Sequence, residues 1–149
     1  MLSPFLKKLL FVRQFFITDG KIEILGEKQV MLPSTAVARL STDQTFDILA
    51  VEMKKSMESY AKKVGGSSGG MIKSVQDIYE TMGLGKMEII RLEADKKEIT
   101  LRIMNVQFDR TDVVEGVLCG LFSFVFSKDF ARKDIKVTKK PTFIDIVIK

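Results

Sequence analysis

The stretch from Asp112 to Ser127, DVVEGVLCGLFSFVFS, decides the fold, because it contains no charged residue after Glu115. In a helix, its spacing would align four small residues on one stripe: Gly116, Gly120, Ser123 and Ser127. Large apolar residues cover the rest, and a helix that is apolar nearly all round is buried. Since the segment is shorter than the ~20 residues that cross a bilayer, we expect the central helix of a soluble core. The smooth stripe admits a ligand or another backbone, and we favour backbone packing.

The composition points to one domain over residues 1–149 and excludes several kinds of site. Hydrophobic residues make up 46% and charged residues 29% of the chain, which argues against disorder. Histidine is absent, and with it the commonest general base, metal ligand and haem ligand. The single cysteine, Cys119, excludes an intrachain disulfide and a multi-cysteine zinc site. We therefore expect a cytoplasmic protein with no metal and no cofactor.

The charge is uneven along the chain. The net charge is +5, and residues 128–149 carry seven Lys or Arg against three Asp. A basic tail can attract nucleic acid or an anionic membrane, although a solvated strand and loop explains the same charges. At the other end, Leu2, Phe5, Leu6, Leu9 and Leu10 recur at helical spacing, which predicts a helix that docks on its own domain. No transmembrane segment is expected.

Turn signals divide the chain into predicted helices and strands. Asp19-Gly20 predicts a hairpin of strands 14–18 and 21–25, followed by a third strand at 29–32 and a short helix at 33–40. A long helix to about residue 63, a flexible Gly/Ser loop at 65–70 and a helix at 71–82 come next. The loop also resembles an engineered linker. Strands follow at 86–92, 98–106, 134–138 and 143–148. This order indicates an α+β domain whose antiparallel sheet packs against a bundle of helices around one central buried helix.

The ends and faces of two helices carry further signals. Ser41 to Gln44 resembles a capping box that opens the long helix. Its apolar positions form a narrow seam that packs on another helix, in the same chain or in a partner: Phe46, Ala50, Met53, Met57, Tyr60 and Val64. Asp112, with Glu115 three residues later, can cap the buried helix.

No catalytic set stands out. The acidic residues Glu88, Glu93, Asp95 and Glu98 surround a hairpin as a solvated sheet face would, and no carboxylate pair suggests acid–base chemistry. Cys119 lies within the buried helix, where a thiol is usually an inert small hydrophobe. A sharper alternative makes it an acylation site or part of a pocket wall. We therefore expect no enzyme.

Three segments together resemble one family. They are Ile22–Glu27 (IEILGE) through Val30–Pro33 (VMLP), Ile78–Glu88 (IYETMGLGKME) and Gly116–Ser123 (GVLCGLFS). They resemble the 4-vinyl-reductase-type small-molecule-binding domains, also called hydrocarbon-binding proteins. The resemblance implies an α+β fold shared with TRAPP trafficking subunits and distantly with haem-NO-binding domains of NO signalling. It also implies a helix-walled apolar cavity and a homodimer.

Many members of that family carry cysteines before the glycine-punctuated helix and in the C-terminal strands. Here those regions read Thr111-Asp112 and Val137-Thr138-Lys139-Lys140, without cysteine. A metal-related role therefore does not carry over to this chain, and nothing in these residues supports reductase chemistry.

The resulting hypothesis is non-enzymatic binding of an apolar or amphipathic small molecule between the central helix and its neighbours. The domain would act as a sensor, carrier or regulatory subunit. The residues expected to contact the ligand are Met53, Met57, Tyr60, Ile78, Met82, Val117, Cys119, Leu121 and Phe124. The alternatives are a structural homodimerisation or assembly module of TRAPP type without a ligand, and a basic surface binder of nucleic acid or anionic membrane.

Overall fold

The computed structural model of the chain describes residues 7, 15–24, 27–64, 71–107 and 110–149. The chain folds as two compact units, Met1–Pro33 and Ser34–Lys149. The expected N-terminal helix and the Gly/Ser loop at 65–70 lie outside the described residues. One domain over 1–149 stays a prediction.

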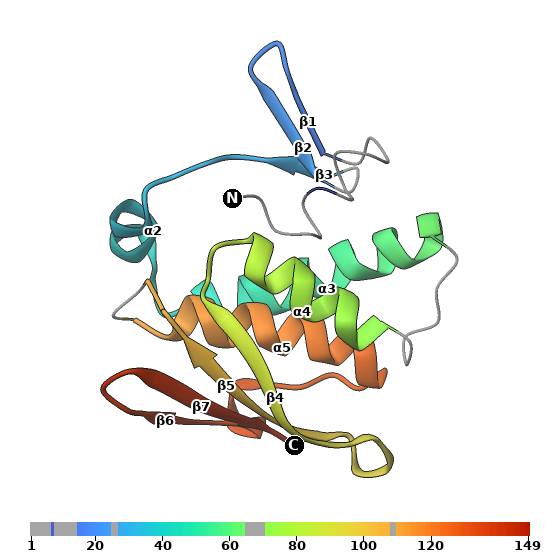
Figure 1. Cartoon of the computed structure of the whole chain (residues 1–149), viewed down its shortest axis with the longest axis vertical. Coiled ribbons are helices and arrows are strands. Elements are labelled where there is room, and N and C mark those ends of the chain that lie inside the picture. The colour runs from blue at the N-terminus through green and yellow to red at the C-terminus, as the bar shows by residue number, and fades with distance from the viewer. Residues whose placement is uncertain (1–6, 8–14, 25–26, 65–70, 108–109) are drawn as a thin grey trace. The chain divides into compact units, whose positions relative to one another are not determined.

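The first unit contains a three-stranded antiparallel sheet in the order β1-β2-β3 (Figure 1). Strands β1 (Phe15–Thr18) and β2 (Lys21–Ile24) form the predicted hairpin. Asp19 and Gly20 both have positive φ, 52° and 73°, as a two-residue turn of this hand requires. The third strand lies earlier in the chain than the predicted 29–32: β3 spans Glu27–Gln29, and the apolar residues after it are exposed and form no strand.

The second unit is an α+β fold with helices on one face of a four-stranded antiparallel sheet (Figure 1). The sheet order is β4-β5-β7-β6, with β4 at Lys86–Glu93, β5 at Glu98–Met104, β6 at Ile135–Lys139 and β7 at Phe143–Ile148. Alternate residues of the central strands are buried under the helices: Ile99, Leu101 and Ile103 on β5, and Ile144, Ile146 and Ile148 on β7. The other face mixes polar with half-buried apolar residues: Thr100, Arg102 and Asp145, and Met104, Phe143 and Val147.

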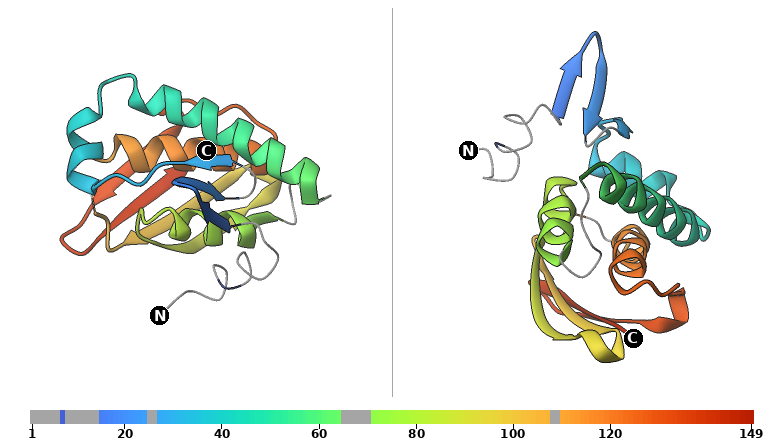
Figure 2. Two further views of the ribbon diagram at one scale, coloured as in Figure 1. Left: turned by 90° about the horizontal axis from the view of Figure 1, so that it is seen from above. Right: turned by 90° about the vertical axis from the view of Figure 1, so that its right-hand side faces the viewer.

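Three helices cover this sheet, after the short helix α2 (Ser34–Leu40). They are α3 (Thr45–Val64), α4 (Ile72–Thr81) and α5 (Asp112–Phe126). In the right-hand view of Figure 2, α5 lies between the sheet and α3, while α4 lies beside them over the sheet. Helix α3 packs along α5, and α4 packs on both β4 and α5. Thirteen of the fifteen residues of α5 are buried, so the prediction of a central buried helix is confirmed.

The start of α3 differs from the predicted capping box by one residue. The side chain of Thr42 accepts a hydrogen bond from the amide of Gln44, and the side chain of Thr45 accepts one from the amide of Thr42. This reciprocal pair satisfies two free amides with hydroxyl groups, in place of the expected Ser41 and Gln44. Ser41 instead donates its hydroxyl to the carbonyl of Val37 at the end of α2.

The small-residue stripe of α5 packs directly on the backbone of α3. A Cβ atom added at Gly116 would lie 2.8 Å from the carbonyl oxygen of Phe46, and one at Gly120 would lie 2.5 Å from that of Ala50. Real side chains do not approach backbone atoms that closely, so only glycine fits at both places. The favoured backbone packing is confirmed, and the seam of α3 meets a helix of its own chain. The stripe ends at Ser123, because Ser127 lies beyond the helix with a φ of 48°.

The first turn of α5 also differs from the expectation. Its N-cap is Thr111, and Asp112 is the first helical residue rather than the cap. The Asp112 carboxylate accepts hydrogen bonds from Arg132 at 2.8 Å and from Arg110 at 3.0 Å. Arg110 also donates to the carbonyl of Ser41, so this cluster ties the start of α5 to the α2–α3 connection and to the segment before β6.

Local conformation explains the remaining boundaries. Gly83, with φ of 75°, follows α4 as the predicted helix stop. A short 3₁₀ turn, η2 (Ala94–Lys96), and the left-handed Lys97 connect β4 to β5 where a turn was predicted. Strand β5 ends two residues earlier than predicted, because Asn105 adopts a left-handed φ of 54°.

Replacing Gly120 by leucine should destabilise the fold. The new Cβ would lie 2.5 Å from the Ala50 oxygen and 2.7 Å from the Met53 Cβ, so the helices must separate. We expect a loss of about 1–3 kcal/mol or more in the free energy of unfolding, measured by urea denaturation. The matched control is Ala94→Leu on the exposed turn after β4, which should change it by less than about 0.5 kcal/mol. An unchanged midpoint for Gly120→Leu would contradict the close approach.

The hydrogen bonds of Asp112 with Arg110 and Arg132 should make the free energy of unfolding decrease at low pH. Burial raises the pKa of Asp112, but the hydrogen bonds from Arg132 and Arg110 outweigh it and hold the pKa below the usual 3.8. A lowered pKa stabilises the folded state above about pH 4, and this contribution disappears as the pH falls through the folded pKa. Asp112→Asn should therefore cost about 1–2 kcal/mol at pH 7 and less at pH 2.

Urea denaturation at the two pH values measures this difference. Asp95→Asn, on the exposed turn after β4, provides the control and should show no such dependence. An equal loss for Asp112→Asn at both pH values would show that the carboxylate charge does not stabilise the fold.

Candidate functional site

The close approach of α5 to α3 determines which side chains of α5 face which neighbour. On one side of the glycine stripe, the Cys119 thiol donates a hydrogen bond to the carbonyl of Phe130, 3.2 Å away in the segment leading to β6. Val117, Leu121 and Phe124 lie on the other side at spacings of four and three. Helix α4 packs on α5 and on β4, which is the opposite edge of the sheet from β6. These three residues therefore face the α4 side.

The side chains of α3 also divide between a side that faces the segment before β6 and a side that faces α4. Lys54 forms an ion pair with Asp129, so it marks the side of α3 toward the segment before β6. Tyr60 lies on the other side of the helix, toward α4. Met53 lies in the seam, next to Gly120, and Met57 is buried. The sides of α3 and α5 that turn toward α4 thus carry Tyr60 of α3 and Val117, Leu121 and Phe124 of α5.

Seven of the nine residues expected to contact a ligand belong to this helix junction, which we define as Met53, Met57 and Tyr60 of α3, Ile78 of α4, and Val117, Leu121 and Phe124 of α5. Met57, Ile78, Val117 and Leu121 are buried, whereas Met53, Tyr60 and Phe124 are half-buried. The set is apolar except for the Tyr60 hydroxyl. Burial raises the pKa of Tyr60, so this hydroxyl is neutral at physiological pH.

The other two expected residues lie elsewhere. Met82 follows the last turn of α4 and is 42% exposed. Cys119 faces Phe130, away from the α4 side. Burial raises the pKa of the Cys119 thiol to about 11, which leaves very little reactive thiolate at neutral pH.

The second tyrosine is part of the core. The hydroxyl of Tyr79 on α4 donates a hydrogen bond to the carbonyl of Leu84, 3.1 Å away, and burial raises its pKa. Gln76 donates its side-chain amide to the carbonyl of Met87 at 2.6 Å. These contacts fix α4 and the glycine-containing connection after it onto the start of β4.

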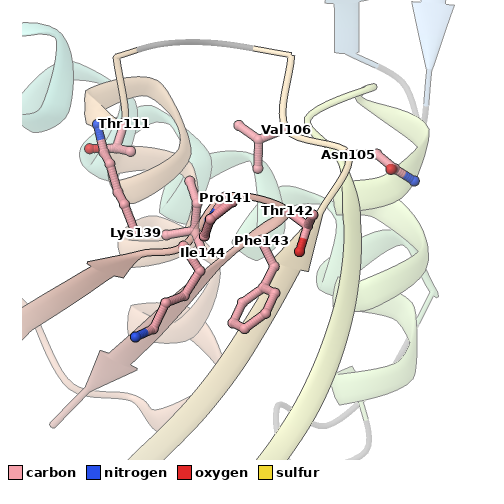
Figure 3. A pocket seen from close by; sticks show the side chains of 9 residues that line it. Asn105, Val106, Thr111, Lys139, Pro141, Thr142, Phe143 and Ile144 are labelled. Atoms are coloured by element: carbon pink, nitrogen blue, oxygen red, sulfur yellow. The ribbon is translucent and has the colours of Figure 1, made fainter.

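A pocket of about 490 Å³ lies at one end of the four-stranded sheet (Figure 3). Its walls come from the segment after β5, the start of α5, the end of β6, the following turn and the start of β7. The lining residues are Asn105, Val106, Thr111, Lys139, Lys140, Pro141, Thr142, Phe143 and Ile144. We did not expect this pocket from the sequence, because its residues come from three separate segments that only the sheet pairing brings together. The one local signal was the pair Lys139-Lys140 before Pro141.

The pocket joins the two regions in which many members of the resembled family carry cysteines. Thr111 comes from the first region, and Lys139 and Lys140 come from the second. In the described part of the chain, no group of three or more cysteine, aspartate or glutamate residues could hold a metal ion. Within the same residues, no helix is long and apolar enough to span a membrane.

Among the comparisons with known proteins, a solved structure matches this chain, whereas family models and curated sequences do not. No protein-family model matches the chain. No curated protein matches it in sequence. Among solved structures, the chain is similar to the crystal structure of the phenol-responsive sensory domain of the transcription activator PoxR with phenol. The match has a TM-score of 0.72, covers 99% of this chain and 91% of that chain, and has 12% sequence identity. A similarity at this level of identity shows a shared fold.

Proposed function

We propose that this chain is a non-enzymatic domain that binds an apolar or amphipathic small molecule at the helix junction. It would serve as a sensor, carrier or regulatory subunit. The observation that carries the proposal is that α5 packs on both α3 and α4, three helices that carry an apolar set of side chains with one tyrosine hydroxyl. The chain shares its fold, over nearly its whole length, with a phenol-responsive sensory domain, and this similarity supports the same class of function.

The side chains of the junction suit an apolar guest. Met53 and Met57 have flexible, unbranched side chains, so they can move aside to admit ligands of different shape. Burial of the ligand's apolar surface would drive binding, at roughly 25 cal/mol per Å² before ordering costs are subtracted. The neutral Tyr60 hydroxyl can donate or accept one hydrogen bond, which would favour ligands with a hydroxyl group.

The proposal extends to the family, the assembly and the location of the protein. The three sequence segments favour the 4-vinyl-reductase-type domains, and we propose a cytoplasmic homodimer on that basis. The seam of α3, which could have packed on a helix of a partner, packs instead on the stripe of α5 within the chain. A dimer would therefore use other apolar surface, such as the exposed Leu40, Ile48 and Val51 of α2 and α3.

The test of ligand binding uses three neutral probes: phenol, toluene and 1-octanol. Each is titrated into the ¹⁵N-labelled full chain, and amide shifts are followed by NMR. We expect saturable shifts at the amides of Met57, Ile78 and Leu121. Tyr60→Phe should weaken phenol about fivefold, the equivalent of one hydrogen bond, and leave toluene unchanged. Native mass spectrometry of the same sample should give twice the 16.8 kDa mass of one chain.

The control is Tyr79→Phe, which removes the only other tyrosine hydroxyl. That hydroxyl bonds Leu84 inside the core, so its loss should lower stability without changing the affinity for phenol. The proposal fails if none of the probes shifts the three amides at up to about 10 mM. It also fails if both tyrosine variants weaken phenol equally.

A further inference from the structure

The side of α3 that faces away from α5 carries an exposed stripe of apolar and charged residues. Helix α5 lies on the inner side of α3, between α3 and the sheet, in the right-hand view of Figure 2. Spacings of four, four, three and four along the helix put one residue of each outer turn on the same line. We call this line the outer stripe; it consists of Asp47, Val51, Lys55, Glu58 and Lys62, all of them exposed.

The charge of the outer stripe changes sign from one end of α3 to the other. Asp47 lies in the first turn of the helix, and Lys62 lies in the last turn. At 1.5 Å per residue, the two are about 22 Å apart along the axis. Neither forms an ion pair with another residue in the described part of the chain, whereas Lys55 pairs with Glu52 of its own helix at 2.7 Å. The stripe therefore ends in an acid and a base that are available to a partner.

Large apolar residues accompany the acidic end of the outer stripe. Val51 lies one turn after Asp47, and Ile48 lies beside the stripe. Ile48 is 57% exposed and Val51 is 52% exposed, so a second helix that covered them would remove apolar surface from water. Exposed ion pairs contribute little affinity but favour one orientation over another. The apolar residues would thus supply the affinity of a contact here, and the charges would supply its direction.

A second copy of α3 running in the opposite direction matches this pattern of charge. Two-fold symmetry brings the first turn of one helix against the last turn of the other, so Asp47 of each copy faces Lys62 of the other. Near the midpoint, each Lys55 then lies about one turn from Glu58 of the other copy. A parallel pair of helices would instead place like charges opposite each other at both ends, which is unfavourable.

We propose that the protein forms a two-fold dimer in which the outer stripes of α3 from two copies pack antiparallel. Two Asp47–Lys62 ion pairs fix the direction, and Ile48 and Val51 are buried between the helices. This inference rests on the proposed homodimer and deepens it, because it assigns the interface and its orientation. The interface lies on the opposite side of α3 from α5, so it leaves the proposed ligand site at the helix junction uncovered.

The test reverses the two charges separately and then combines the two variants. Sedimentation equilibrium of the full chain at low salt gives the dissociation constant of the dimer. Asp47→Lys creates two like-charged contacts in its own dimer, and Lys62→Glu does the same. Each variant alone should therefore dimerise at least about tenfold more weakly than the wild type. An equimolar mixture should recover the wild-type affinity within about threefold, because both contacts of the mixed dimer again join opposite charges.

Matched reversals outside the outer stripe control for the change of charge itself. Asp95→Lys, on the turn after β4, and Lys133→Glu, before β6, make the same changes at exposed positions. Both should alter the dissociation constant by less than about twofold. Urea denaturation checks the folding of every variant, since Asp47 and Lys62 also stabilise their own ends of α3. A variant whose α3 is merely weakened stays weakened in the mixture, so recovery there identifies the interface.

Three results would overturn the proposal. One is a wild-type chain that is monomeric at up to about 1 mM, which would leave the outer stripe to a different protein. Another is a dimer that neither single reversal weakens, which would place the interface on another surface. The third is a mixture that stays as weak as its two components, which would exclude the antiparallel pairing. Only the first result also contradicts the homodimer, and none of the three changes the NMR shifts expected from ligands at the helix junction.

Discussion

The contact of two glycines with the backbone of α3 is the constraint on which the second unit depends. Gly116 and Gly120 lie so close to the carbonyl groups of Phe46 and Ala50 that α5 has one rotation about its axis in which it can pack there. That rotation directs Cys119 toward Phe130 and places Leu121 toward α4. The small residues thus do more than fill space, because they determine which surface each large residue of the helix meets.

The segment that follows α5 is held against this helix, and its position determines where the next strand, β6, begins. The hydroxyl of Ser123 accepts a hydrogen bond from the amide of Phe130, and the Cys119 thiol donates to the carbonyl of the same residue. Phe130 also stacks edge-on against Phe126, with ring centres 6.0 Å apart. The chain is therefore turned back beside the helix before β6 begins. The position of β6, and with it the lysines at its end, follows from contacts made by the buried helix.

Local signals predicted most elements of this fold, and non-local contacts account for the differences. Asp19-Gly20 and Gly83 identified a turn and a helix end because their backbone conformations need those residue types. The start of α3 and that of α5 were each predicted one residue away from where they lie. At α3, neighbouring Ser and Thr side chains can all accept a backbone hydrogen bond. At α5, the N-cap Thr111 instead donates its hydroxyl to the Glu115 carboxylate. The arginines decided the outcome at Asp112, and Arg132 lies 20 residues away from it in sequence. The apolar spacing of α3 and the small-residue stripe of α5 predicted the contact between these two helices, at Phe46, Ala50 and Met53 of α3. The sheet-end pocket was not predictable, because it depends on the pairing of β7 with both β5 and β6.

The separation between α5 and α3 is the most direct test of this account. In a ¹³C-edited NOESY spectrum of the full chain, the Hα protons of Gly120 should give strong cross-peaks to protons of Ala50 and Met53, because the two backbones are in contact. Those of Gly116 should give cross-peaks to Phe46 and Leu49. Cross-peaks from the same glycine protons to Leu101 or Ile146 of the sheet, in place of α3, would show that α5 is rotated and would contradict the account.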